Sequence, residues 1–242
     1  MTITVIIPVL NEARLIGRTL SHTVALGFDD VIVVDGGSSD PTCALVKSLA
    51  TQLRSVPPVG HTSAHDSVRL LSAPLGRARQ LNAGAAASHC EVLLFLHADT
   101  LLPPNATEAI SEALLDPNAV GGRFNVRFDS DRAVAQIVAG MMNLRSRWSG
   151  IATGDQAIFV RREVFERIGG FTDIPLMEDI DFTRRLKRAG RLVPLTTYVV
   201  TAFRRWEHNG PLRTIVLMWT LRFLYWIGVS PHRLQHFYSI VR

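Results

Sequence analysis

The stretch at residues 4–12, TVIIPVLNE, decides the fold, because it is a continuous apolar run that ends in polar side chains. Three more runs of this kind follow, at residues 31–34, 68–71 and 92–96. Continuous rather than alternating apolar runs are typical of strands that are buried on both faces, as in a parallel sheet. The four runs therefore predict strands of a mostly parallel sheet.

Helical patterns fill the gaps between these runs. Apolar residues recur every three or four positions in two of the gaps, at Ala13, Ile16, Leu20 and Val24 and again at Ala78, Leu81 and Ala85. Pro41, which follows the capping residues 38–40, predicts the start of a third helix. Strands that alternate with helices predict an α/β fold in which helices flank the central sheet.

The second half of the chain has a less regular pattern. It predicts helices at residues 105–115, 133–144 and 179–189, and strands at residues 122–128 and 157–160. Residues 60–66 read as an exposed loop. We expect one domain over residues 1–211, whose halves 1–103 and 104–211 form two sides of a cleft, and an apolar, basic helical tail over residues 212–242.

The composition is that of a globular protein with a sizeable core. Of the 242 residues, 47% are hydrophobic and 19% are charged, a balance that excludes disorder, collagen and coiled coils. The only cysteines are Cys43 and Cys90, so we expect neither a disulfide framework nor a cysteine-built zinc site. The N-terminus has no basic start and soon meets Pro8, Asn11 and Glu12, so we expect no signal peptide and a cytoplasmic protein.

The net charge of +5 comes entirely from the end of the chain, where six arginines and one acid, Glu207, follow residue 203. This asymmetry indicates an anionic substrate or a membrane surface there, with a solvated basic end as the alternative.

Residues 212–229 are the most apolar stretch but contain Arg213 and Arg222. A membrane span needs about 20 apolar residues, and an arginine inside it costs roughly 2.5–3.5 kcal/mol. We therefore expect a helix that lies on the inner face of the plasma membrane or forms a protein contact, such as a homo-oligomer, rather than a span. A buried helix of the same domain is the alternative.

Polar residues follow the predicted strands at the points where they end. Asn11 and Glu12 follow the first run, Asp35 follows the second, and His97 and Asp99 follow the fourth. Because ligands bind at the carboxyl ends of parallel strands, we expect these side chains to form one site. The first turn lacks the Gly-x-Gly-x-x-Gly of a dinucleotide fold and no P-loop is present, which argues against dehydrogenases and simple NTPases.

Five ordered motifs carry a family resemblance: VIIPVLNE at 5–12, VVDGGSSD at 33–40, GRARQLNAGA at 76–85, LFLHAD at 94–99 and MEDIDFTRRL at 177–186. Together they resemble family-2 glycosyltransferases of the GT-A fold, over roughly residues 3–206. The triplet at 97–99 and FRRWEHNG at 203–210 resemble a small bacterial subgroup found beside radical-SAM and arsenosugar genes.

The resemblance implies an inverting, metal-dependent enzyme that moves a sugar from a nucleoside diphosphate donor, with UDP the expected nucleotide, to an acceptor hydroxyl. The donor would lie in the nucleotide-binding half, residues 1–103, and the acceptor, whose identity is unknown, against residues 104–211. No nucleic acid is expected as a partner.

The resemblance also implies a divalent metal, Mn²⁺ or Mg²⁺, which would neutralise charge on the leaving diphosphate. The family holds the metal with an Asp-x-Asp triplet, which here reads His97-Ala98-Asp99, so the first Asp is replaced. Asp99 is the implied metal ligand, and His97 would contact the metal or the ribose. His208 could reach the metal from the later motif or lie on the surface, and Asp99 could instead cap a helix before Pro103.

The nucleoside-binding positions come from the same motifs. Asp35 would accept a hydrogen bond from the N3–H of uracil, and Glu12 would help to bind the nucleoside. Arg77 would meet the base or a phosphate, or else lie on the surface, and Asn82 would order its loop. The implied nucleotide-binding residues are Pro8, Val9, Asn11, Glu12, Asp35, Gly37, Ser38, Arg77, Asn82 and His97.

Glu178 and Asp179 resemble the family's Glu-Asp motif, whose Asp is the usual catalytic base. Helical spacing places Asp179 on the inward face of Phe182 and Leu186, and Asp181 on the face of Arg184, Arg185 and Arg188. A helix cap or a first-turn acid is the alternative for Asp179.

Other residues complete the expected site. Asp155 would bind an acceptor hydroxyl or shape a turn, and the diphosphate would meet Arg204, Arg205 and Trp206.

Two other functions fit parts of this pattern. A nucleotidyltransferase would share the sheet and the metal, but VLNEAR at 9–14 lacks the glycine-rich phosphate loop of that class. A catalytically silent nucleotide-binding or scaffold protein would explain His97, whereas the retained Asp99 and Asp179 argue against it.

Overall fold

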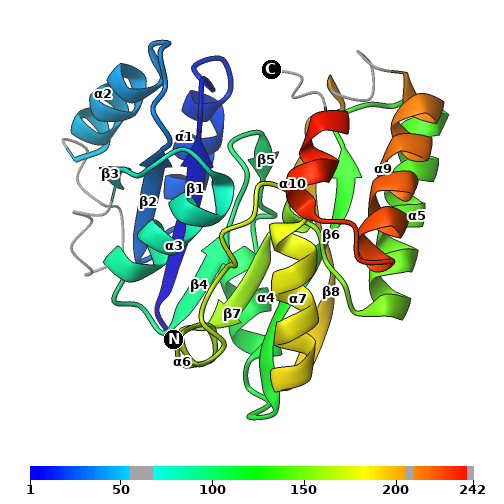
Figure 1. The fold of residues 1–242 in the computed structure, drawn as a ribbon. Coiled ribbons are helices and arrows are strands. Elements are labelled where there is room, and N and C mark those ends of the chain that lie inside the picture. The colour runs from blue at the N-terminus through cyan, green and yellow to red at the C-terminus, as the bar shows by residue number, and fades with distance from the viewer. Residues whose placement is uncertain (55–67, 205–209, 239–242) are drawn as a thin grey trace.

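The computed structural model of the protein describes residues 1–54, 68–204 and 210–238, and its described strands form one eight-stranded sheet (Figure 1). The strands are β1 Ile3–Val9, β2 Asp30–Asp35, β3 Val68–Ser72, β4 Val92–Phe95, β5 Thr100–Leu101, β6 Ala119–Phe128, β7 Ile158–Arg161 and β8 Arg191–Thr201. Their order across the sheet is β3-β2-β1-β4-β7-β6-β8-β5.

Most neighbouring strands in this sheet are parallel. β1 is parallel to β2 and to β4, β2 is parallel to β3, and β6 is parallel to β8. β7 runs antiparallel to both β4 and β6, and β5 runs antiparallel to β8. The prediction of a mostly parallel sheet is confirmed, with the addition that the sheet is mixed.

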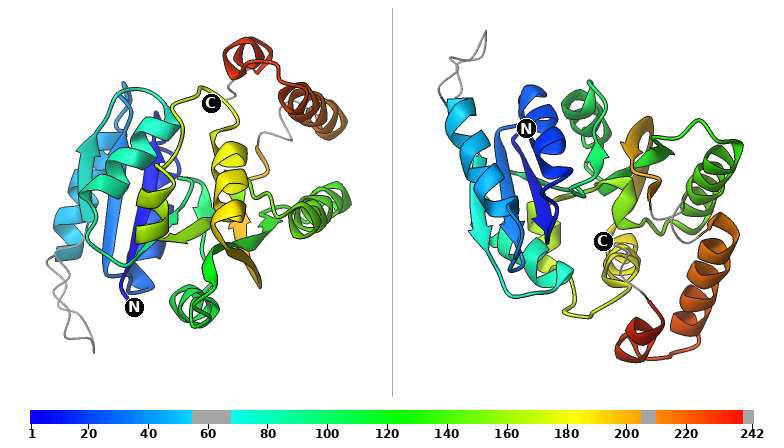
Figure 2. Two further views of the ribbon diagram at one scale, coloured as in Figure 1. Left: turned by 60° about the horizontal axis from the view of Figure 1, so that its bottom comes forward. Right: turned by 90° about the horizontal axis from the view of Figure 1, so that it is seen from above.

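Helices cover both faces of the sheet (Figure 2). They are α1 Ile16–Ala25, α2 Thr42–Arg54, α3 Arg77–Ala87, α4 Ala106–Ala113, α5 Ala133–Ser149, α6 Arg162–Arg167, α7 Glu178–Ala189, α9 Pro211–Trp226 and α10 Pro231–Leu234, with the 3₁₀ turns η1 Gly154–Gln156 and η2 Gln235–Phe237. α1, α2, α4 and α5 share one core cluster, and α3, α6 and α7 share the other. The fold is therefore a three-layer α/β arrangement, as predicted.

β1 shows why the continuous apolar run forms a central strand. Val5 and Ile7 face one core cluster and Ile6 faces the other, and all three are fully buried. Burying an aliphatic side chain of this size stabilises the fold by roughly 1.5–3 kcal/mol, so both faces of the strand contribute. A strand with one solvated face would have had polar residues at alternate positions.

β8 is the main element that the sequence did not predict. Pro194 interrupts it, and several of its residues are exposed. It forms because it pairs with β6 along most of its length, with register shifts next to Ala119 and between Arg123 and Asn125. A partner strand distant in sequence, rather than a local apolar pattern, therefore specifies β8.

The other differences concern element boundaries. The helix expected to end at residue 144 continues to Ser149, and the apolar tail forms α9 and α10. The predicted loop at residues 60–66 lies outside the described residues. The division at residues 103 and 211 stays a prediction.

Candidate active site

The carboxyl ends of β1 and β2 are held together by Gln80 of α3, a residue that the sequence did not single out. Its buried Nε2 donates hydrogen bonds to the carbonyl oxygens of Val9 and Val34, at 2.8 Å each. A Cβ at Gly36 would lie 3.0 Å from the Gln80 side chain, so glycine allows this close approach. The only sequence signal for Gln80 is a polar residue inside the third motif.

Asp35 ends β2, and its carboxylate is buried inside the loop that follows. It accepts the backbone N–H groups of Gly37, at 2.9 Å, and of Ser38, at 3.1 Å. Burial alone would raise the pKa of Asp35, but hydrogen bonds from Ser38, Gly37 and Cys43 hold it below its usual value. A charged Asp35 therefore lies at the edge of the sheet where the nucleoside was expected.

Asn11 joins the loop after β1 to the loop after β2. Its Oδ1 accepts the N–H of Ser39 at 2.8 Å, and its own N–H donates to Ser38 Oγ at 2.9 Å. In the same loop, Asp40 accepts the N–H of Thr42 at 3.0 Å, where α2 begins. Asp40 thus acts as a helix cap, while Asn11 and Ser38 shape the loops around Asp35.

Two carboxylates from different strand ends converge on one cation. Nη2 of Arg204, which follows β8, lies 3.0 Å from Glu12 Oε2 and 3.5 Å from Asp99 Oδ2. α4 begins only at Ala106, with Asn105 at its cap, so the helix-cap interpretation of Asp99 is wrong. Arg205, Trp206 and His208 lie outside the described residues.

The residues present fit a divalent metal that is held partly by substrate. Within the described ranges, no group of three His, Cys, Asp or Glu side chains could hold a metal by itself. Mg²⁺-like ions, however, are usually bound by one or two carboxylates together with substrate phosphates. Glu12 and Asp99 both contact the positive charge of Arg204. These two carboxylates are the protein donors that this mode of metal binding requires.

His97 and Asp179 both contact η1, which lies between them. His97 Nδ1 is 3.2 Å from Asp155 Oδ1, and the N–H of Gly154 donates to Asp179 Oδ2 at 2.8 Å. A Cβ on Gly154 would lie 2.2 Å from His97 Nε2, so any larger residue here would displace the His97 ring. The structure thus joins the end of β4 to the start of α7, which the sequence could not show.

Glu178, next to Asp179, is buried and faces Arg77 of α3. Their Oε1 and Nη1 atoms are 3.4 Å apart. Burial raises the pKa of Glu178, the charge of Arg77 opposes that rise, and the charge of Asp179 adds to it. Arg77 therefore lies beside the predicted catalytic acids, and its guanidinium holds α3 against α7.

The first turn of α7 separates its acidic residues as the helical spacing predicted. Asp181 Oδ2 pairs with Arg185 Nε at 2.9 Å and accepts the hydroxyl of Thr172 at 2.7 Å. Met177 occupies the cap position, so Asp179 is a first-turn acid and not the cap. The carboxylate of Asp179 points instead toward Gly154, on the side of His97 and Asp155.

Backbone strain gathers around these residues. Among the described residues, the non-glycine positions with positive φ are Asn11 (56°), Ala157 (44°) and Met177 (69°). Each one borders an element of the site: the loop after β1, η1 or the start of α7. Such conformations cost about 1–3 kcal/mol each and persist where the surroundings fix a functional geometry.

The remaining predicted residues support loops and strands. Asn82 donates to the Phe171 carbonyl at 2.8 Å and accepts its N–H at 2.9 Å, so it orders the loop before α7. Pro8 lies near the end of β1, and the side chain of Val9 is buried in the core. Val9 can face a ligand only through its backbone.

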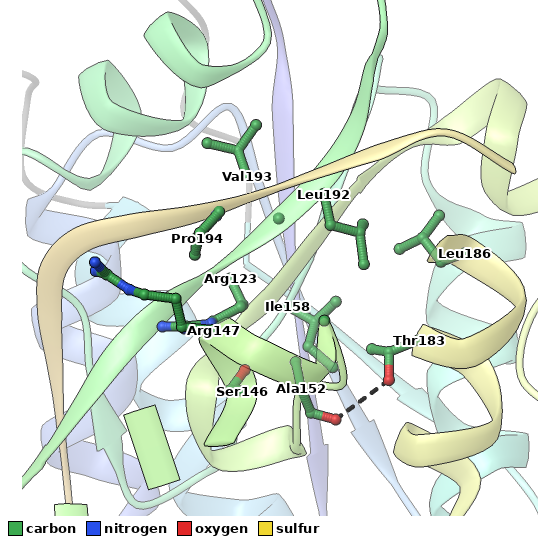
Figure 3. A pocket seen from close by; sticks show the side chains of 12 residues that line it. Arg123, Ser146, Arg147, Ala152, Ile158, Thr183, Leu186, Leu192, Val193 and Pro194 are labelled. Carbon is green, nitrogen blue, oxygen red and sulfur yellow. Dashed lines mark hydrogen bonds between the residues drawn. The ribbon is translucent and has the colours of Figure 1, made fainter. Parts of the chain in front are cut away.

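A cavity of about 60 Å³ lies apart from these residues, between β6, β8, α5 and α7 (Figure 3). None of the predicted site residues lines it. Its buried cation, Arg123, donates hydrogen bonds to the side chain of Asn125 and the carbonyls of Phe124 and Asn143. The guanidinium group of Arg123 therefore already has partners, whereas the hydroxyl of Ser146, which also lines the cavity, has none among the described residues.

Comparisons with known proteins identify the family to which this chain is similar. The sequence model of the family described as "Glycosyl transferase family 2" matches residues 4–171. "Probable glycosyltransferase YdaM" of Bacillus subtilis is 26% identical over 232 residues, which are 86% of this chain and 50% of that protein. The chain therefore spans about half the length of this curated relative.

Solved structures of low sequence identity share the fold. "Mannosyltransferase PcManGT from Pyrobaculum calidifontis in complex with GDP-Man and Mn2+" has a TM-score of 0.63 at 23% identity, over 82% of this chain and 56% of that one. S. aureus TarS 1-349 in complex with UDP-GlcNAc has a TM-score of 0.64 at 18% identity, over 84% and 58%. At these identities the likeness concerns the fold alone, which is that of the GT-A enzymes.

Proposed function

This chain belongs to glycosyl transferase family 2, and we propose that it is an inverting, metal-dependent transferase that uses a UDP-sugar. The observation that carries the proposal is that Asp35 and Asp99 follow strands that run parallel in one sheet, while Asp179 contacts η1, which also contacts His97. Asp35 lies at the end of β2, Asp99 follows β4 and pairs with Arg204, and Asp179 contacts Gly154.

The chain's own residues divide into a donor side and an acceptor side. Asp35 and the loop shaped by Asn11 would bind the nucleoside, and Arg204 would bind the diphosphate. A divalent metal held by Asp99, with Glu12 or His97 nearby, would stabilise the leaving diphosphate. On the acceptor side, Asp179 would take the proton of the attacking hydroxyl, because its two oxygens retain acceptor capacity beyond the N–H groups of Gly154 and Ile180.

Release of nucleoside diphosphate from a panel of sugar donors tests the proposal. The panel includes UDP-, GDP- and ADP-sugars with Mn²⁺ or Mg²⁺. A nucleotidyltransferase would release pyrophosphate from nucleoside triphosphates instead, and a silent scaffold would release neither product. Membership of the arsenosugar subgroup and a cytoplasmic location are also proposed. The acceptor expected from that subgroup is a small soluble metabolite.

We expect UDP to bind roughly ten- to a hundredfold more tightly than ADP or GDP, because a charged hydrogen bond from the base to Asp35 is worth that much. Asp35→Asn should remove this preference, measured by calorimetry with the three diphosphates. Asp40→Asn is the matched control, since Asp40 lies in the same loop but accepts from Thr42 at the start of α2. Equal affinities of the unmodified protein for UDP and ADP would refute the role of Asp35.

We further propose that the outer sides of α5 and α9 lie on an anionic membrane. This aromatic face consists of Ile137, Met141, Leu144 and Trp148 of α5, Val216, Trp219, Phe223 and Trp226 of α9, and Ile227 directly after α9, which are all exposed. Trp148 is 82% exposed and Trp226 is 72% exposed. Both views in Figure 2 place the two helices on the side of the molecule opposite α2.

Charge favours an anionic lipid surface over other occupants of the aromatic face. Neither α5 nor α9 contains an acidic residue, whereas each contains one exposed arginine, Arg147 in α5 and Arg213 in α9. Tryptophan beside arginine is typical of helices that lie in the membrane interface. No described helix is both long enough and apolar enough to cross a bilayer.

Sedimentation with vesicles of phosphatidylcholine, with and without phosphatidylglycerol, tests the aromatic face. We expect binding only to the anionic vesicles, and a loss of roughly tenfold in partitioning for each of Trp148→Ser and Trp226→Ser, since each removes one large apolar side chain. Leu115→Ser is the control, because Leu115 is exposed but lies just after α4. Protein that stays off these vesicles, or that forms a dimer sensitive to the same substitutions, would overturn the proposal.

A further inference from the structure

Within residues 1–54, 68–204 and 210–238, no partner neutralises the charges of two arginines on the expected acceptor side. Arg145 lies near the end of α5, and Arg222 lies on the inward side of α9. Nε and Nη2 of Arg145 are fully buried and have no hydrogen-bond partner. In the described part of the chain, Arg222 likewise has no ion pair, and both guanidinium groups are largely removed from water.

The surroundings explain why these arginines remain unpaired. The charges of Asp155 and Asp179 act on both guanidinium groups, although the described residues form no ion pair between these acids and either arginine. Asp155 is paired with His97, and Asp179 accepts the N–H groups of Gly154 and Ile180. The carboxylates of the site are therefore engaged elsewhere.

The charge of Arg222 also acts on Arg145. The pKa of Arg145 is lowered to about 10, first by burial and next by the charge of Arg222. Burial likewise lowers the pKa of Arg222. Two like charges that are shielded from water destabilise the folded chain unless an anion lies between them.

Other unsatisfied polar atoms lie close to Arg145 in the sequence. In the described part of the chain, Gln156 Nε2 of η1 is buried without a hydrogen-bond partner, and so is Ser146 Oγ at the end of α5, which lines the cavity described above. Buried polar groups without partners are uncommon in folded proteins and require an explanation. Gln156 directly follows Asp155 in η1, so an unsatisfied donor lies next to the predicted acceptor site.

We propose that Arg145 and Arg222 form an anion subsite that binds a phosphate or carboxylate group of the acceptor, next to Asp155 and Asp179. Guanidinium groups match the oxygens of such anions through paired hydrogen bonds. The anion would anchor the acceptor while its hydroxyl reaches Asp179. A neutral acceptor would leave both arginines unpaired and would be disfavoured. This inference rests on the proposed function only for its assignment of the ligand as the acceptor.

Titration with inorganic phosphate tests the subsite without any transfer reaction. The titration is followed by calorimetry and by the thermal midpoint, once with UDP and Mg²⁺ present to fill the donor side and once without them. We expect Arg145→Gln and Arg222→Gln each to weaken phosphate binding by roughly ten- to a hundredfold. Their thermal midpoints without phosphate should not fall, because each substitution removes a buried unpaired charge. If one variant fails to fold, the other carries the test.

Matched controls separate the subsite from net charge. Arg147→Gln and Arg213→Gln remove exposed arginines from the same two helices and should leave phosphate binding nearly unchanged. Equal losses in these controls, or unchanged phosphate affinity in Arg145→Gln and Arg222→Gln, would overturn the proposal. UDP affinity is measured in parallel, so a failure of the donor site is seen separately from a failure of the anion subsite.

Competition then identifies the source of the anion. Glycerol 3-phosphate in solution and phosphatidylglycerol in vesicles both carry a hydroxyl and a phosphate, and glycerol is the neutral control. Displacement of inorganic phosphate by glycerol 3-phosphate indicates a soluble acceptor, and displacement by phosphatidylglycerol vesicles indicates a lipid acceptor. If neutral glycerol displaced inorganic phosphate as well as the two phosphate compounds do, the site would not recognise an anion.

Discussion

Asp179→Asn should reduce sugar transfer by about 10²–10⁴-fold while leaving the affinity for UDP nearly unchanged. The base acts only when the acceptor proton leaves, and donor binding does not involve that proton. Asparagine has nearly the same volume, and its remaining oxygen can still accept one of the two N–H groups that Asp179 binds, from Gly154 or Ile180. Steady-state transfer rates and UDP binding by calorimetry measure the two effects separately.

Asp181→Asn is the control for this experiment. Asp181 lies on the same helical turn, but its carboxylate pairs with Arg185 and accepts from Thr172, away from Gly154. We therefore expect transfer by Asp181→Asn to remain close to that of the unmodified enzyme. A large loss in Asp181→Asn together with full transfer in Asp179→Asn would reassign the base.

Asp99→Ala should abolish metal-dependent donor binding and leave the fold intact. The substitution removes one of the two carboxylates that converge on a cation, and the charge of the diphosphate would then be opposed by too little positive charge. Titration of UDP binding against Mn²⁺ measures the effect, and circular dichroism checks the fold. Metal-dependent turnover at the normal level in Asp99→Ala would exclude Asp99 as a ligand.

Arg204→Gln distinguishes a metal ligand from a structural partner. If Asp99 serves only to pair with Arg204, the two substitutions should have the same effect. If Asp99 binds the metal, Arg204→Gln should weaken diphosphate binding but retain its response to Mn²⁺. The change in diphosphate affinity on adding Mn²⁺ therefore distinguishes the two roles of Asp99, whereas the diphosphate affinity at one Mn²⁺ concentration does not.

The sequence by itself determined the central sheet and the residues at its edge. The apolar runs at β1, β2, β3 and β4 specify buried strands because burial on both faces requires apolar residues at every position. The residues that follow them, such as Asp35 and Asp99, lie at one edge because parallel strands end together. The separation of Asp179 from Asp181 also came from local periodicity, since the helical repeat sets which residues share a face.

Only the tertiary structure decided which of these residues meet. Arg204 contacts Glu12, which lies 192 positions earlier in the sequence. Gln80 joins the ends of β1 and β2, although both strands lie far before it in the sequence. β8 forms by pairing with β6. Its sequence does not predict a strand, because β8 contains Pro194 and several exposed residues. A local pattern reports how deeply a residue is buried, whereas contacts between distant residues depend on strand order and on helix packing. For that reason Arg145 and Arg222 look like ordinary helix residues in the sequence, and only the fold places both within the influence of the charges of Asp155 and Asp179.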